Sequence, residues 1–163
     1  LACRPQLIIA DEPTTALDVT IQAQVLELIK KLQQSEKTSM LLITHDLGIV
    51  AETCDNVAIM YAGHLIEYAD LKSLYTAPKH PYTQGLFNAV PTLESPLGSR
   101  LAVIPGLPPD PTNLPKGCSF SPRCPYAKDL CHERACGMQE VETGHFVDCY
   151  FPLTPASGNA FLQ

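Results

Sequence analysis

The sequence predicts an α/β protein built on a parallel sheet, and two features of its first half support this fold class. The first feature is a pair of short, uninterrupted apolar runs, Leu7–Ala10 and Met40–Ile43. Runs of this length suit strands that are buried on both faces, as strands of parallel sheets are. The second feature is an amphipathic helix between the runs, predicted over about residues 19–34 and capped by Asp18. Its apolar face consists of Ile21, Val25, Leu28, Ile29 and Leu32.

The elements that follow residue 43 continue the alternation of helix and strand. We expect the next strand to join the same parallel sheet, because strand, helix, strand, helix, strand is the order of an α/β fold. The expected elements, in order, are a helix over about 47–54, a strand over 56–61, a hairpin turn at 62–64, a strand over 65–67 and short helices near 70–76 and 81–89.

Composition divides the chain near residue 90. Residues 91–163 hold 11 of the 15 prolines and 5 of the 7 cysteines. Because proline has no backbone N–H to donate, the segment around residues 105–115 cannot form a helix or a central strand. We therefore expect four segments: an α/β part (1–90), a proline-rich linker (91–117), an irregular, cysteine-rich extension (118–153) and a disordered tail (154–163).

Charge and hydropathy exclude two classes of function. The 11 Lys and Arg residues against 17 Asp and Glu residues give a net charge of −6. That balance argues against a nucleic-acid partner, because phosphate contacts need a basic face. No apolar run approaches the roughly 18 residues of a membrane span.

Polar residues follow both predicted buried strands at the point where each strand ends. Asp11 and Glu12 follow the first strand, and His45 lies two residues after the second. Carboxyl ends of parallel strands meet at one edge of the sheet, so these side chains should converge if the strands are neighbours. A carboxylate there can anchor hydrated Mg²⁺, and a second can orient an attacking water, which together predict phosphoryl transfer. The alternative is that Asp11 caps a loop and His45 is an ordinary residue at a strand end.

The same residues resemble the ABC-transporter ATPases. Residues 7–13 resemble the Walker B strand of that family, residues 14–18 its D-loop, and residues 43–46 its switch-histidine segment. The resemblance implies a P-loop NTPase sheet that uses ATP and Mg²⁺. It also implies that Asp11 holds Mg²⁺ through water, that Glu12 is the general base, and that His45 contacts the γ-phosphate. Asp18 would couple two ATPase subunits in a nucleotide-bound dimer.

The Gly-rich phosphate loop, the glutamine loop and the Leu-Ser-Gly-Gly segment of that family are absent from these 163 residues. We therefore expect the sequence to be the C-terminal half of a larger subunit. On their own, these residues should neither bind ATP tightly nor hydrolyse it. Missing sheet neighbours should also leave apolar surface and a strand edge exposed.

Four of the five cysteines in the C-terminal part suit a metal site. Cys118, Cys124, Cys131 and Cys149 could complete a tetrahedral zinc site or the shell of an iron–sulfur cluster. Their gaps are longer than those of a zinc ribbon. Disulfides and inert buried thiols are the alternatives.

The C-terminal part resembles the extension found in ATPases of oligopeptide/dipeptide importers. Segments that carry this resemblance are His80–Gln84, Pro105–Pro108, Gly117–Ala127, and His145 with Cys149. The resemblance implies a 4Fe–4S cluster on Cys118, Cys124, Cys131 and Cys149, with Cys136 outside the ligand set. His64 and His80 are expected to face solvent as loop residues.

Three hypotheses about function follow. The first is the ATPase subunit of a peptide importer, bound to transmembrane permease subunits and to a second ATPase subunit, and served indirectly by a peptide-binding protein. It would lie on the cytoplasmic face of a bacterial inner membrane. The second is a metal or redox module whose chemistry is cluster binding, and the third is the same ATPase importing nickel, opines or glutathione.

Overall fold

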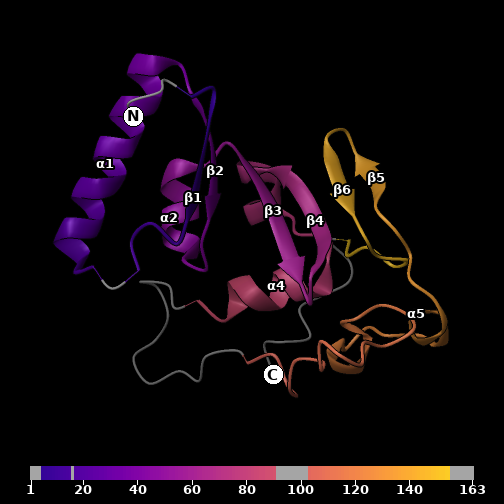
Figure 1. The fold of residues 1–163 in the computed structure, drawn as a ribbon. Coiled ribbons are helices and arrows are strands. Elements are labelled where there is room, and N and C mark those ends of the chain that lie inside the picture. Colours follow the sequence, from indigo (N-terminus) through magenta and orange to yellow (C-terminus); the bar gives the residue numbers. More distant parts are fainter. Residues whose placement is uncertain (1–4, 16, 91–102, 155–163) are drawn as a thin grey trace. The chain divides into compact units, whose positions relative to one another are not determined.

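The computed structural model describes residues 5–15, 17–90 and 103–154. The chain forms two compact units, Leu1–Asp55 and Asn56–Gln163 (Figure 1). We call them unit 1 and unit 2. This division does not coincide with the boundary expected near residue 90. Part of the expected linker (91–102), most of the expected tail (155–163) and residues 1–4 lie outside the described residues.

Unit 1 contains the predicted strand–helix–strand arrangement. Strand β1 (Leu7–Asp11) pairs in parallel with β2 (Ser39–Ile43), and the register places Asp11 opposite Ile43. Helix α1 (Val19–Glu36) connects the two strands, and α2 (Leu47–Thr53) follows the second. The prediction of two neighbouring parallel strands is confirmed.

Short polar residues begin both helices of unit 1. The carboxylate of Asp18 accepts a hydrogen bond from the backbone N–H of Ile21, as the sequence predicted, and Asp46 accepts from Gly48 and Ile49. Each carboxylate satisfies N–H groups that have no partner within the helix. At its other end α1 stops at Lys37, whose φ of 52° is left-handed.

The strands of unit 1 are not buried on both faces. Ile9 is 63% exposed and Leu41 is 50% exposed. In the described part of unit 1, β1 and β2 pair only with each other, so no further strands cover their edges. This exposed apolar surface and unpaired edge were expected from the sequence.

Unit 2 is built on an antiparallel sheet of four strands in the order β3-β4-β6-β5. Strand β3 (Asn56–Tyr61) therefore does not join the parallel sheet, and that expectation is wrong. The reason is the two-residue turn at Ala62 and Gly63, which returns the chain as β4 (His64–Asp70) beside β3. Alternating exposed and buried residues in β3 fit a sheet with one solvated face.

The cysteine-rich extension contributes regular elements to unit 2, although the sequence predicted it to be irregular. Strand β6 (His145–Val147) pairs with β4, and β5 (Gln139–Glu142) pairs with β6. Residues 103–117 contain neither helix nor strand, as their prolines predicted. The remaining helices are α3 (Leu71–Thr76), α4 (Pro81–Asn88), the 3-10 turn η1 (Ser121–Arg123) and α5 (Asp129–Glu133).

Aromatic side chains join the first half of unit 2 to the extension. The ring of Phe120, which is 1% exposed, lies 5.4 Å from the rings of both Tyr61 and Tyr82. Arg123 then anchors the proline-rich segment, because its guanidinium donates to the carbonyls of Ile104 and Pro105 and to the hydroxyl of Tyr61. No helix among the described residues is long and apolar enough to cross a membrane.

The β3–β4 turn offers a test of this fold. Ala62 has φ 48° and Gly63 has φ 79°, and a turn with two positive φ angles favours Asn-Gly. We expect Ala62→Asn to raise the free energy of unfolding by about 1 kcal/mol, because asparagine tolerates the left-handed region better than alanine. Denaturant unfolding measures this, with Ala58→Asn in β3 as a control. Lower stability of Ala62→Asn would contradict the turn assignment.

Candidate functional site

The carboxyl edge of the β1–β2 pair brings two predicted site residues into contact. Glu12 directly follows β1, and His45 lies just after β2. His45 Nδ1 is 2.7 Å from Glu12 Oε1, although 33 residues separate them in sequence. The parallel register causes this contact, because it aligns the ends of both strands. The expectation that these residues share one edge of the sheet is confirmed.

The backbone of Glu12 is held in an unusual conformation. Its N–H donates to the carbonyl of Ile43, which extends the ladder by one step, and its φ is 47°. This left-handed conformation is costly for a residue with a side chain and is commonest at functional sites. The Thr15 hydroxyl donates to Glu12 Oε2 at 2.9 Å, so both oxygens of the carboxylate are engaged.

The contact between Glu12 and His45 favours the charged form of both side chains, and the pair is open to solvent. The hydrogen bond from His45, followed by that from Thr15, holds the pKa of Glu12 below its ordinary value. The same hydrogen bond and the charge of Glu12 raise the pKa of His45. The side chain of His45 is 86% exposed and that of Glu12 is 36% exposed, so a ligand can reach both.

The other two predicted residues of this site take different positions. Asp11 is the last residue of β1 and is exposed, next to Glu12 in the chain. Asp18 is exposed at the N-terminus of α1, where its side chain caps the helix. The structure thus joins Glu12 and His45 directly and places Asp11 at the same strand end.

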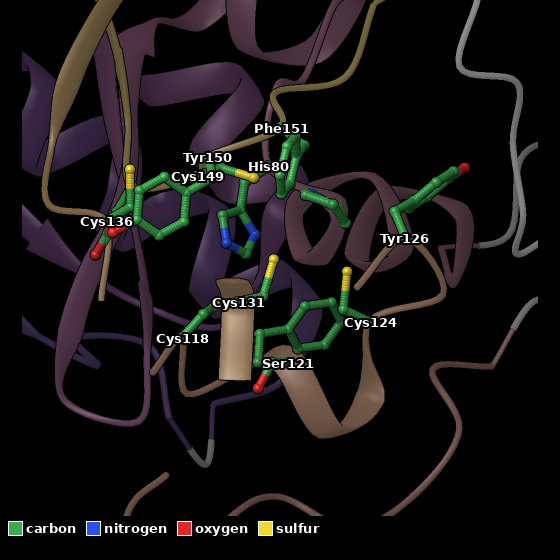
Figure 2. A pocket seen from close by; sticks show the side chains of 13 residues that line it. His80, Cys118, Ser121, Cys124, Tyr126, Cys131, Cys136, Cys149, Tyr150 and Phe151 are labelled. Carbon is green, nitrogen blue, oxygen red and sulfur yellow. The ribbon is translucent and has the colours of Figure 1, made fainter. Parts of the chain in front are cut away.

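A second candidate site lies within unit 2, in a pocket that gathers five cysteines (Figure 2). Aromatic side chains and His80 complete its wall. All described cysteines are free, so the structure contains none of the disulfides weighed as an alternative among these residues. We call this the cysteine pocket; its cysteines are Cys118, Cys124, Cys131, Cys136 and Cys149.

Backbone N–H groups point at three of these sulfurs. The N–H groups of Phe120, Tyr126 and Phe151 each bond to the thiol two residues earlier, at Cys118, Cys124 and Cys149 respectively. These hydrogen bonds favour the thiolate and lower the pKa. Burial opposes them more strongly, and it raises the pKa of Cys124 to about 11 and that of Cys149 to about 12.

Cys136 lies in the same pocket. Burial, followed by the charge of Asp148, raises its pKa, and the charges of Cys118 and Cys131 act in the same direction. Figure 2 shows the Tyr150 ring between Cys136 and His80.

Glycine allows two segments of the pocket to approach each other. The N–H of Cys118 donates to the carbonyl of Cys131 at 2.8 Å. A Cβ atom at Gly117 would lie 2.2 Å from that same carbonyl oxygen, which no side chain can do. Gly117 therefore fixes the distance between these two cysteines.

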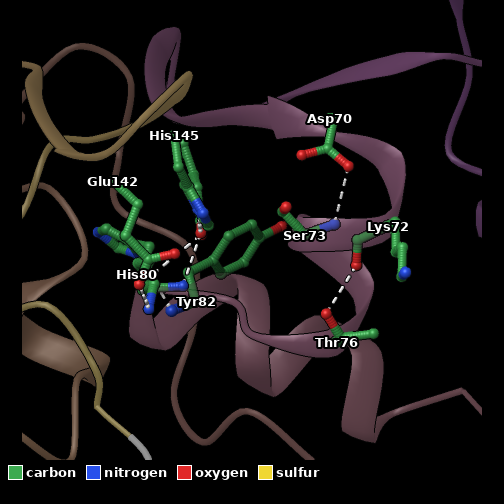
Figure 3. Close-up of polar contacts among 10 residues, drawn as sticks. Asp70, Lys72, Ser73, Thr76, His80, Tyr82, Glu142 and His145 are labelled. Carbon is green, nitrogen blue, oxygen red and sulfur yellow. Dashed lines mark hydrogen bonds and ion pairs between the residues drawn. The ribbon is translucent and has the colours of Figure 1, made fainter.

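A buried carboxylate connects the pocket to the sheet. Glu67 on β4 is 0% exposed and accepts hydrogen bonds from the backbone N–H groups of Lys79 and His80, at 2.6 and 2.9 Å. His145 Nε2 on β6 lies 2.7 Å from the same carboxylate (Figure 3). Glu67 thus joins β4, the start of α4 and the extension.

His80 is buried, which contradicts the expectation that it faces solvent. It is 1% exposed and caps α4, where its Nδ1 accepts the N–H of Tyr82 at 3.0 Å. Burial lowers its pKa to about 3. The proline at position 81 was the available sequence clue, because proline favours the first position of a helix and places a cap before it. His64 is exposed, as expected.

Glu67 was missed entirely by the sequence analysis, since one acidic residue in a strand carries no pattern of its own. Within the described residues, no group of three or more His, Cys, Asp or Glu is arranged to hold a metal ion. The pocket therefore gathers thiols without converging them on one point.

The comparisons with known proteins show which proteins the chain is similar to. Residues 66–131 match the family model for the oligopeptide/dipeptide transporter, C-terminal region. The chain is 48% identical over 153 residues to the oligopeptide transport ATP-binding protein OppD of Salmonella typhimurium, covering 94% of the chain and 45% of that protein. It is 47% identical over 156 residues to the dipeptide transport ATP-binding protein DppD of Escherichia coli, covering 96% and 47%.

A third relative, the oligopeptide transport ATP-binding protein AppD of Bacillus subtilis, is 51% identical over 150 residues, covering 92% of the chain and 45% of that protein. The chain is therefore similar to a part of the ATP-binding proteins of oligopeptide and dipeptide transporters. The chain spans about half the length of the curated relatives it matches.

The Glu12–His45 pair predicts a specific response to pH. The pair is fully charged between the lowered pKa of Glu12 and the raised pKa of His45, and it is lost as the pH rises through the latter. We expect Glu12→Gln to lower the pKa of His45 toward its ordinary value, measured by NMR titration of the imidazole in the full-length protein.

Glu27→Gln is the matched control for this titration, because it removes another exposed carboxylate of unit 1 that pairs with Lys31 instead. The pKa of His45 should not change in that variant. An unchanged pKa in Glu12→Gln would show that the two side chains do not pair in solution.

Proposed function

We propose that the full-length protein is the ATP-hydrolysing subunit of an ABC importer for oligopeptides or dipeptides. The observation that carries this proposal is the Glu12–His45 contact at the carboxyl edge of β1 and β2, in a chain similar to ATP-binding proteins of peptide transporters. Residues 1–90 are in this proposal the C-terminal part of the nucleotide-binding domain.

Each residue of the edge has a role in hydrolysis. Asp11 holds Mg²⁺ through water, which suits an exposed carboxylate at a strand end, and Mg²⁺ when bound neutralises charge on the phosphates. Glu12 accepts the proton of the attacking water, and His45 donates a hydrogen bond to the terminal phosphate. Asp18 lies at the surface and contacts the second ATPase subunit.

His45 has a second ring nitrogen for the phosphate. Its Nδ1 engages Oε1 of Glu12, so its Nε2 can donate to the terminal phosphate while the pair is kept. Thr15 engages Oε2, and each carboxylate oxygen keeps a lone pair that can accept the proton of the attacking water.

Partners and location follow from the same proposal. Transmembrane permease subunits and a second ATPase subunit complete the importer on the cytoplasmic face of the inner membrane. A peptide-binding protein acts on it indirectly, and no nucleic acid is involved. Relatives named for oligopeptide and dipeptide transport favour peptides over nickel, opines or glutathione as cargo.

The role of Glu12 is tested in the full-length subunit with its permease partners. We expect Glu12→Gln to lower ATP turnover by about 100-fold or more while ATP binding is kept, because a general base contributes about 10²–10⁴-fold. Glu52→Gln, on the exposed face of α2, is the control and should keep full turnover. Normal turnover in Glu12→Gln would overturn the assignment of the base.

We also propose that the cysteine pocket holds a 4Fe–4S cluster on Cys118, Cys124, Cys131 and Cys149. Support comes from the pocket that gathers these thiols and from the backbone N–H groups directed at three of the sulfurs. Four thiolates can complete the shell of a 4Fe–4S cluster, and the gaps between these cysteines in the sequence are longer than those of a zinc ribbon. Cys136 is outside the ligand set.

Raised thiol pKa values shape this site. Burial keeps Cys124 and Cys149 protonated at neutral pH, so ligand binding must release their protons. Backbone N–H groups then stabilise the thiolates that form. When bound, the cluster supplies one-electron redox capacity or a rigid cross-link between segments of the extension.

Anaerobic purification of the full-length protein tests the cluster. We expect a brown protein with about four iron and four sulfide per chain, and its absorption should disappear in Cys149→Ser. Cys136→Ser is the matched control and should keep the cluster. Stoichiometric zinc without iron, or loss of the cluster in Cys136→Ser alone, would refute this ligand set.

A further inference from the structure

His80 presents a hydrogen-bond donor at the wall of the cysteine pocket. Its Nδ1 accepts the backbone N–H of Tyr82 at 3.0 Å, and a nitrogen that accepts a hydrogen bond carries no proton. The proton of the neutral ring is therefore on Nε2. Figure 2 shows the ring projecting among the sulfurs of Cys131 and Cys149.

Two contacts hold His80 in place. The backbone N–H of His80 donates to buried Glu67, and its ring packs 5.8 Å from that of Phe120. His80 is only 1% exposed, and among the described residues its ring hydrogen bond is the one that Nδ1 accepts. The Nε2–H is therefore available to an acceptor inside the pocket.

A second polar side chain without a partner lies on another segment of the pocket. Ser121 lines the same pocket, is 3% exposed, and its hydroxyl has no hydrogen-bond partner among the described residues. His80, which caps α4, and Ser121 of η1 thus line a pocket that is formed mostly by thiols and aromatic rings. Sulfur ligands carrying negative charge are the acceptors that this wall would suit.

We propose that His80, through its Nε2–H, donates a hydrogen bond to the sulfur atoms of the group bound by Cys118, Cys124, Cys131 and Cys149. His80 is then a positioning residue of the cysteine pocket. This inference rests on the proposed cluster. It gives His80, which is buried in unit 2, a role beyond capping α4.

The expected consequence is electrostatic. A hydrogen bond to sulfur draws charge from the cluster and stabilises the reduced state, which raises the reduction potential. Removing the donor should make the cluster harder to reduce. A tenfold weaker stabilisation of the reduced state corresponds to a shift of about 59 mV for a one-electron couple.

Two substitutions separate the donor from the helix cap. In His80→Asn the amide oxygen lies near the position of Nδ1, so the cap is kept and the donor to the pocket is lost. In His80→Gln the longer amide reaches the position of Nε2, so the donor is kept and the cap is lost. If His80 only capped α4, His80→Gln would change the potential more than His80→Asn would.

The measurement is the midpoint potential of the cluster in the full-length protein, followed by absorption and EPR under anaerobic conditions. We expect the midpoint potential of His80→Asn to be about 59 mV more negative than that of the wild-type protein, which corresponds to a tenfold weaker stabilisation of the reduced state. The potential of His80→Gln should be nearly unchanged. An unchanged potential in His80→Asn would overturn the inference and leave the cluster proposal intact. A wild-type protein that binds no cluster would overturn both.

A measurement on the wild-type protein covers the case in which His80→Asn does not fold. Protein labelled with ¹⁵N-histidine, reduced and studied by pulsed EPR, should show weak coupling of the cluster spin to a histidine nitrogen. A spectrum with cluster signals but no such coupling would overturn the inference.

Discussion

The buried carboxylate of Glu67 is the interaction on which unit 2 depends. It is 0% exposed and joins β4, the N-terminus of α4 and β6 through Lys79, His80 and His145. A buried charge is tolerated only when hydrogen bonds replace its hydration, and here the replacement comes from segments far apart in sequence. Because one of them is His80, the same carboxylate positions the wall of the cysteine pocket.

Unit 1 depends on a simpler constraint, the parallel register of β1 and β2. That register places Glu12 against His45 and extends the ladder through the N–H of Glu12. The two units therefore support different chemistry by different means. Strand ends supply an exposed acid–base pair in unit 1, whereas loops and turns held by glycine and backbone hydrogen bonds surround thiols in unit 2.

Sequence reasoning succeeded where local pattern determines structure. Apolar runs and helical spacing gave both strands of unit 1 and α1, and the prolines of residues 103–117 excluded regular structure there. Reasoning failed for β3, because a run of six residues does not reveal whether its partner is parallel. It failed for His80, since its burial depends on Phe120 and Glu67, which lie 40 and 13 residues away in the chain.

The sequence by itself identified the residues of both candidate sites. These are Asp11, Glu12 and His45 at strand ends, and the cysteines of a proline-stiffened extension. Residue type and position in an element are local properties, so a sequence can carry them. Tertiary structure alone decided that β6 pairs with β4, that five cysteines gather in one pocket, and that His80 turns inward. These outcomes depend on burial and on partners distant in the chain, which no local pattern encodes.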